Sequence, residues 1–130
     1  MVRAALSLGS WFVRTVVELG SWEHECCGPA YERDVVVDLR CLIVPARDGS
    51  PRFVESHHDL STWRSATWVR GRVVDIAIQH PDGSTEPIGR LPSGAALRGV
   101  HDHDDGHLEQ PWTGVSVSND SDRCLVTVAS

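Results

Sequence analysis

The sequence predicts an all-β protein, a small barrel or barrel-like sandwich with two long loops. Hydrophobic residues alternate with polar ones in several segments, polar turn residues separate these segments, and no segment shows a sustained helical stripe. At 130 residues the chain has the size of one domain, so we expect a single β-rich domain over residues 1–130. Its 41% hydrophobic and 23% charged residues are ordinary globular proportions, which excludes wholesale disorder.

Three segments carry the clearest alternation. Within each strand the side chains point alternately to opposite faces, so every second residue shares a face. In the first segment Arg14 and Glu18 take the polar face, and in the second Asp38 and Arg40 do so. The residues expected on the apolar faces are Val13, Thr15, Val17 and Leu19, then Val35, Val37, Leu39, Cys41 and Ile43, then Val74, Ile76 and Ile78.

The remaining chain is read from its turn residues. Residues 80–84, His-Pro-Asp-Gly-Ser, predict a turn, and residues 118–122 predict a hairpin loop between short strands at 115–117 and 125–128. Residues 60–66 predict one helical turn with Ser61 as its N-cap. The two long loops are expected at residues 45–63 and 92–111, and loops of that length are often functional.

The charge of the chain restricts its partners. With a formal net charge of −6, the protein lacks the positive surface that binding to nucleic acid or to an anionic membrane needs. No run approaches the ~18 apolar residues of a membrane span, and the apolar run near Met1 is too short for a secretion signal. We therefore expect a cytoplasmic protein whose four cysteines are thiols, ligands or core residues rather than disulfides.

Two cysteines stand side by side between Trp22 and Tyr31. The Gly28-Pro29 pair after them predicts that Cys26 and Cys27 lie where a strand breaks into a turn, so that both sulfurs can converge. A second cluster, Glu55-Ser56-His57-His58-Asp59, supplies two imidazoles. Thiolate and imidazole together suit zinc, so the predicted metal ligands are Cys26, Cys27, His57 and His58.

Two other interpretations of these residues stay open. Ligation by adjacent residues is awkward, and free cysteine is among the most buried residue types, so both thiols could be small core residues. Alternatively, Cys27 is the nucleophile of a cysteine- or metal-dependent hydrolase, with His57 or His58 as its base and Asp59 orienting the base. The aromatic rings of Trp22 and Tyr31 flank the cysteine pair and are the predicted ligand-binding residues.

The run His101-Asp102-His103-Asp104-Asp105-Gly106-His107 has the most unusual composition in the chain. It suits a loose site for a divalent transition metal or a pH-sensitive loop, because neighbouring aspartates favour protonated histidine. We prefer its interpretation as a solvated loop. The five tryptophans are expected partly in the core and partly along a ligand groove, and the arginines near Trp68 are expected to form a salt-bridged face.

The first 80 residues resemble a family of small uncharacterised proteins from high-GC soil bacteria. The resemblance rests on a strand, a tryptophan, Cys-Cys-Gly, an aromatic residue and a second strand, with Glu-Ser-His-His-Asp and Gly-Arg-Val farther on. In this chain the central part reads Val16-Val17-Glu18-Leu19, Trp22, Cys26-Cys27-Gly28, Tyr31 and Val35-Val36-Val37. This chain has a longer N-terminal lead, residues 1–10. The resemblance implies a shared fold and a shared Cys/His locus, and no particular reaction.

Taken together, these patterns predict a binding or interaction module that recognises a small molecule or a protein. Its predicted site is the meeting point of the Cys26-Cys27-Gly28 turn and the His57-His58 loop, with zinc as the expected metal. An exposed edge strand would also allow a homodimer, although no residue pattern selects one.

Overall fold

The computed structural model describes residues 13–56 and 66–130, apart from the side chains of Trp22, Glu23 and Cys27. The chain is mostly β, as the sequence predicts. In chain order the elements are β1 (Arg14–Gly20), α2 (Ser21–Cys27), β2 (Tyr31–Glu32), β3 (Val36–Pro45), β4 (Pro51–Glu55), β5 (Ala66–Gln79), β6 (Thr85–Pro87), β7 (Arg90–Leu91), α3 (Gly94–Leu97), β8 (Leu108–Glu109), β9 (Ser116–Val117) and β10 (Arg123–Ala129).

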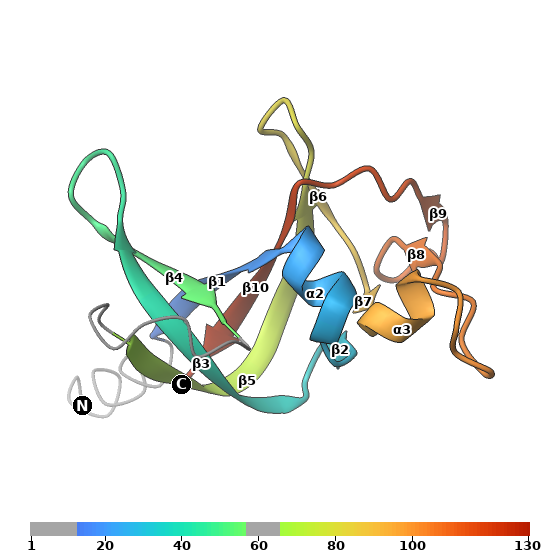
Figure 1. Cartoon of the computed structure of the whole chain (residues 1–130), viewed down its shortest axis with the longest axis horizontal. Helices are drawn as coiled ribbons and strands as arrows, with labels where there is room; N and C mark the ends of the chain where they lie inside the picture. Colours follow the sequence, from blue (N-terminus) through green and yellow to red (C-terminus); the bar gives the residue numbers. More distant parts are fainter. Residues whose placement is uncertain (1–12, 57–65) are drawn as a thin grey trace, which may run out of the picture.

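Five strands form a closed, barrel-like ring (Figure 1). Their order is β10-β1-β4-β3-β5, and β5 pairs back onto β10. Neighbouring strands are antiparallel except β1 and β4, which run parallel where Val17 faces Phe53 and Glu18 faces Val54. Closing the sheet pairs both edges of the ring strands, and β6 adds a short outer strand to β5.

The ring is filled by aliphatic side chains from alternate strand positions. In β1, Val17 and Leu19 point inward, and in β3, Leu39 and Cys41 do the same, so the predicted inner faces of these two strands are confirmed there. Burial of this cluster supplies the main favourable free energy of folding. The other inward residues of the ring are Val69, Val73, Ile76, Ile78, Cys124, Val126 and Val128.

The longest strand, β5, changes its inward face at a bulge. Asp75 pairs with Thr127 and Val73 with Val128, so Val74 is an extra residue opposite β10. Because of the bulge, Val73 and Ile76 both point inward and Val74 does not. The prediction that Val74 shares a face with Ile76 is therefore wrong. The bulge bends β5 enough for one strand to pair with β3 along its first half and with β10 along its second half.

Several predicted loops and turns differ in the structure. The predicted loop at 45–63 contains β4, and the predicted loop at 92–111 contains α3 and β8. The predicted hairpin across residues 118–122 is wrong, because β9 pairs with β8 while β10 pairs with β1 and β5. The helical turn predicted at 60–66 lies outside the described residues up to 65, and Ala66 begins β5.

A flank of short elements lies beside the ring. It consists of α2, α3 and two two-stranded sheets, β2–β7 and β8–β9 (Figure 1). The predicted strand-to-turn break at the cysteine pair is wrong, because residues 21–27 form helix α2. Seven residues make only two turns, too few to show a helical stripe in the sequence. Among the described residues, no helix has the length and apolar character that crossing a membrane requires.

Helices α2 and α3 approach each other through glycine. The N–H of Gly94 donates to the carbonyl oxygen of Gly28 over 2.9 Å. A Cβ on Gly94 would lie 2.3 Å from the His24 carbonyl oxygen and 2.4 Å from that of Glu25. Because these are backbone atoms, they can move only if α2 and α3 separate.

We therefore expect Gly94→Ala to destabilise the protein. Overlap with two backbone carbonyls should cost about 1–3 kcal/mol in the free energy of unfolding, measured by denaturant titration. Gly20→Ala is the matched control, because a Cβ there meets no atom within 4 Å. Equal stability of the two variants would contradict the close helix contact.

Candidate functional site

The cysteine segment is held in place by the buried ring of His24. His24 is 2% exposed, and its Nε2–H donates to the carbonyl oxygen of Pro92 over 2.7 Å. Its main chain closes α2, because the N–H of Gly28 donates to the His24 carbonyl oxygen over 2.8 Å. The end of α2 is thus fixed by one side-chain and one main-chain contact of the same residue.

Tyr31 joins this segment to the ring. Its hydroxyl donates to Oε2 of Glu55 over 2.7 Å, in a buried contact, and its ring centroid lies 6.0 Å from that of His24. Burial, followed by the neighbouring Glu55 carboxylate, raises the pKa of Tyr31, so the hydroxyl keeps its proton and acts as a donor. Glu55 is the last residue of β4 and is 5% exposed.

The buried thiols are inert core residues. Cys41 lies opposite Glu55 in the β3–β4 register, and burial, followed by that carboxylate, raises the pKa of Cys41 to about 12. Burial likewise raises the pKa of Cys124 to about 11. Since the thiolate is the reactive form, burial and the raised pKa make both thiols poor nucleophiles near neutral pH. Cys41 and Cys124 are thus small buried residues, whereas the interpretation of Cys26 as a core residue is wrong, because its side chain is exposed.

The predicted site residues are only partly described. Cys26 lies on α2 with an exposed side chain, whereas Cys27 and Trp22 are placed by their main chain alone. His57 and His58, and Asp59 with them, lie outside the described residues. Tyr31 contributes a buried hydrogen bond, and its predicted role toward a ligand stays a prediction. The hydrolase alternative, which needs Cys27 with His57 or His58, stays a prediction as well.

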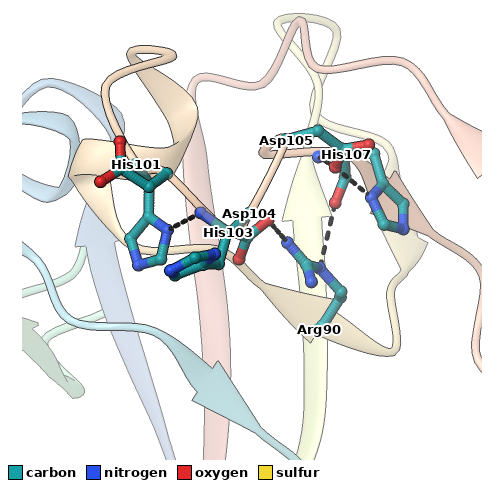
Figure 2. A pocket seen from close by; sticks show the side chains of 7 residues that line it. Arg90, His101, His103, Asp104, Asp105 and His107 are labelled. Atoms are coloured by element: carbon teal, nitrogen blue, oxygen red, sulfur yellow. Dashed lines mark hydrogen bonds and ion pairs between the residues drawn. The ribbon is translucent and has the colours of Figure 1, made fainter.

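The His/Asp run forms an exposed loop around an open hollow of about 520 Å³ (Figure 2). Arg90 pairs with Asp104, and its Nε donates to the His107 carbonyl oxygen over 3.2 Å. Nδ1 of His107 lies 2.5 Å from Asp105, whose carboxylate raises the pKa of the imidazole. Two of the aspartates are thus paired with positive groups, Asp104 with Arg90 of β7 and Asp105 with His107 of the loop itself.

This arrangement does not gather metal ligands. His101 accepts a hydrogen bond at Nδ1 from the main-chain N–H of His103 over 3.1 Å, and the two ring centroids stand 6.4 Å apart. Within residues 13–56 and 66–130, no group of three or more histidine, cysteine or acidic side chains is arranged to hold a metal ion. The structure shows residues 101–107 as an exposed loop, and its roles as a metal site or a pH-sensitive loop stay predictions.

His80, which the sequence places only in a turn, holds two segments together. Nδ1 of His80 lies 2.7 Å from a carboxylate oxygen of Asp120, and Nε2 lies 3.1 Å from one of Glu86. A carboxylate only accepts, so both contacts require the doubly protonated ring. Asp82 adds a further negative charge nearby. The hydrogen bonds that the His80 ring donates to Glu86 and to Asp120 raise its pKa.

The His80 clamp borders the start of α2. The loop that carries Asp120 continues into Ser121 and Asp122. The Ser121 carbonyl oxygen accepts from the Ser21 hydroxyl over 3.0 Å, and the Asp122 carbonyl oxygen accepts from the Ser21 N–H over 3.4 Å. His80 therefore fixes the loop against which the helix begins.

The fold and the site define a class: a small barrel-like β protein with a helical flank that carries an exposed thiol. Comparison of the chain with known protein families, with curated proteins and with solved structures gives no match. The resemblance drawn from the sequence pattern thus stays a prediction.

The clamp predicts a pH-dependent part of the stability. Because the folded-state pKa of His80 is raised above 6.5, its stabilisation is complete below that value and is lost as the pH rises through the folded pKa. The difference in unfolding free energy between wild type and His80→Gln should therefore be largest below pH 6.5 and shrink as the pH is raised through the folded-state pKa of His80. A difference that stays constant, or grows with pH, would contradict the clamp.

Proposed function

We propose that this chain is a small binding module whose primary site lies at the end of α2 and takes a zinc ion. Cys26 supplies an exposed thiol there, and Cys27, His57 and His58 complete the ligand set that the sequence predicts. Thiolate sulfur and imidazole nitrogen are the donors that structural zinc sites use. The role of the ion is to fix the segment as a binding surface rather than to carry out a reaction.

One observation carries this proposal: the hydrogen bond from Tyr31 to Glu55. Tyr31 comes four residues after Cys27, and Glu55 precedes His57 by two. The 2.7 Å contact therefore joins the two chain segments from which the four ligands come, although they are 24 residues apart. The parallel pairing of β1 with β4 brings the start of α2 and the end of β4 to the same end of the ring, and the Tyr31–Glu55 contact extends this proximity to the residues after Cys27.

Cys41 and Cys124 differ from the thiol of Cys26 in the proposed site because they are buried. Cys41 and Cys124 are 0% and 5% exposed, and burial raises the pKa of both, so neither competes for the ion. Cys26 has no comparable cover, because its side chain is exposed. Zinc binding should consequently protect only the adjacent cysteine pair.

The test is zinc binding measured by competition with a chromophoric chelator, together with alkylation of the thiols. We expect about one zinc ion per chain, and slower alkylation of Cys26 in its presence. Cys26→Ser should weaken binding at least tenfold, because one of four bonds is lost. Cys124→Ala is the matched control and should bind as wild type does.

A second control separates this site from the His/Asp loop. The double variant His101→Ala/His103→Ala removes two of the three imidazoles of that loop and should leave zinc affinity unchanged. Loss of zinc in that variant would place the ion in the loop and contradict the proposal. Absence of zinc binding in the wild-type protein would contradict it equally.

A further inference from the structure

Asp34 and Trp112 are the two non-glycine residues of the described chain with a left-handed backbone conformation. Arg33, which precedes Asp34, contacts the ring of Trp112. Asp34 has φ = 71° and Trp112 has φ = 68°. Arg33, next to Asp34, places its guanidinium carbon 5.0 Å from the centroid of the Trp112 ring. Such conformations cost free energy in residues with a Cβ and cluster at functional positions.

The stability of the fold does not explain why a tryptophan stands at position 112. Trp112 is 89% exposed, so its indole contributes little buried area, and glycine would adopt the same φ with less strain. The residue stands in the loop between β8 and β9, where Gly114 already provides one left-handed position. A large apolar ring in this place is better explained by an external contact.

The Trp112 indole is held by a hydrogen-bonded loop and by a hydrogen-bonded arginine. The loop is closed by the N–H of Gln110 donating to Val115 over 2.8 Å and the N–H of Thr113 donating to Pro111 over 2.8 Å. Arg33 is fixed as well, because it donates to the Val74 carbonyl oxygen over 2.9 Å and to Asp75 over 2.7 Å. A partner would meet a preorganised surface and lose little entropy in ordering it.

Charge selects the chemistry of that partner. Asp75 balances the charge of Arg33, so the guanidinium does not repel a second cation near the ring. Glu32 is exposed beside Arg33, and the Glu109 carboxylate lies so close to the loop that a Cβ on Gly114 would be 3.4 Å from it. The whole chain carries a net charge of −6, which attracts cations from a distance.

We propose that Trp112 is the centre of a docking surface for a basic peptide segment of a partner protein. An arginine or lysine head group packs on the indole face away from Arg33, where the ring quadrupole attracts it. The alkyl stem lies along the exposed side chain of Val115, three residues farther on. Exposed tryptophan ringed by polar groups is typical of residues that dominate binding energy.

The test measures binding of a capped peptide of alternating arginine and glycine by isothermal calorimetry. Trp112→Ala should weaken binding between about threefold and thirtyfold, the range of a cation–aromatic contact. Trp68→Ala is the matched control, since Trp68 is 55% exposed and has its own arginine, Arg70, at 5.9 Å. That variant should bind as wild type does, and affinity should fall as salt is added.

A second variant separates binding from folding. Trp112→Gly removes the indole and suits the left-handed backbone, so it should bind as weakly as Trp112→Ala while unfolding at the same or a higher denaturant concentration. The proposal is overturned if the wild type does not bind the peptide or if Trp68→Ala weakens binding as much as Trp112→Ala does. Tighter binding of an oligonucleotide or an acidic peptide would overturn it as well.

Discussion

The hydrogen bond between Tyr31 and Glu55 is the contact on which the arrangement of this molecule depends. The ring of five strands buries its own core, and Tyr31, four residues after the end of α2, links the helix to that core. Its ring belongs to the core cluster, and its hydroxyl reaches a carboxylate at the end of β4. Burying a carboxylate to this extent costs free energy unless it accepts hydrogen bonds, so the hydrogen bond from Tyr31 stabilises the buried Glu55. It fixes the helical flank, and with it the cysteine pair, against one end of the ring.

Closure of the ring explains why the chemistry of the chain lies outside it. The interior is occupied by aliphatic side chains, by two thiols whose pKa values are raised by burial and, at one end, by the Tyr31 hydroxyl bonded to Glu55. The described histidines and the exposed ring of Trp112 lie instead on the loops and short elements that connect the strands, where a rigid scaffold can present them. The His80 clamp, the loop at 101–107 and the Arg33–Trp112 contact are three separate uses of that surface.

The sequence predicted the class of fold and the inward faces of β1 and β3, because a period of two depends only on local geometry. It could not predict that Val74 would be a bulge residue, since this depends on pairing with Thr127 and Val128 about fifty residues later. Helix α2 was missed because its stability comes from His24 and from contact with Gly94, which no seven-residue pattern reveals.

In the candidate site, the sequence pattern shows Glu55 only as a neighbour of two histidines. Its partner Tyr31 was assigned to a ligand, since nothing in either segment indicates that they meet. The sequence predicts that the tryptophans lie partly in the core and partly along a groove without assigning either role; β5 and the β8–β9 loop place Trp68 and Trp112 outward.

The joining of flank and ring can be measured directly by a double-mutant cycle. Tyr31→Phe, Glu55→Gln and the double variant should be compared with wild type for their free energies of unfolding in denaturant. If the buried contact joins the two parts, the cycle should give a coupling energy of about 1–3 kcal/mol, as expected for a hydrogen bond to a charged group. Additive effects of the two substitutions, with a coupling near zero, would show that the hydroxyl and the carboxylate do not depend on each other and would contradict this account of how the cysteine segment is positioned.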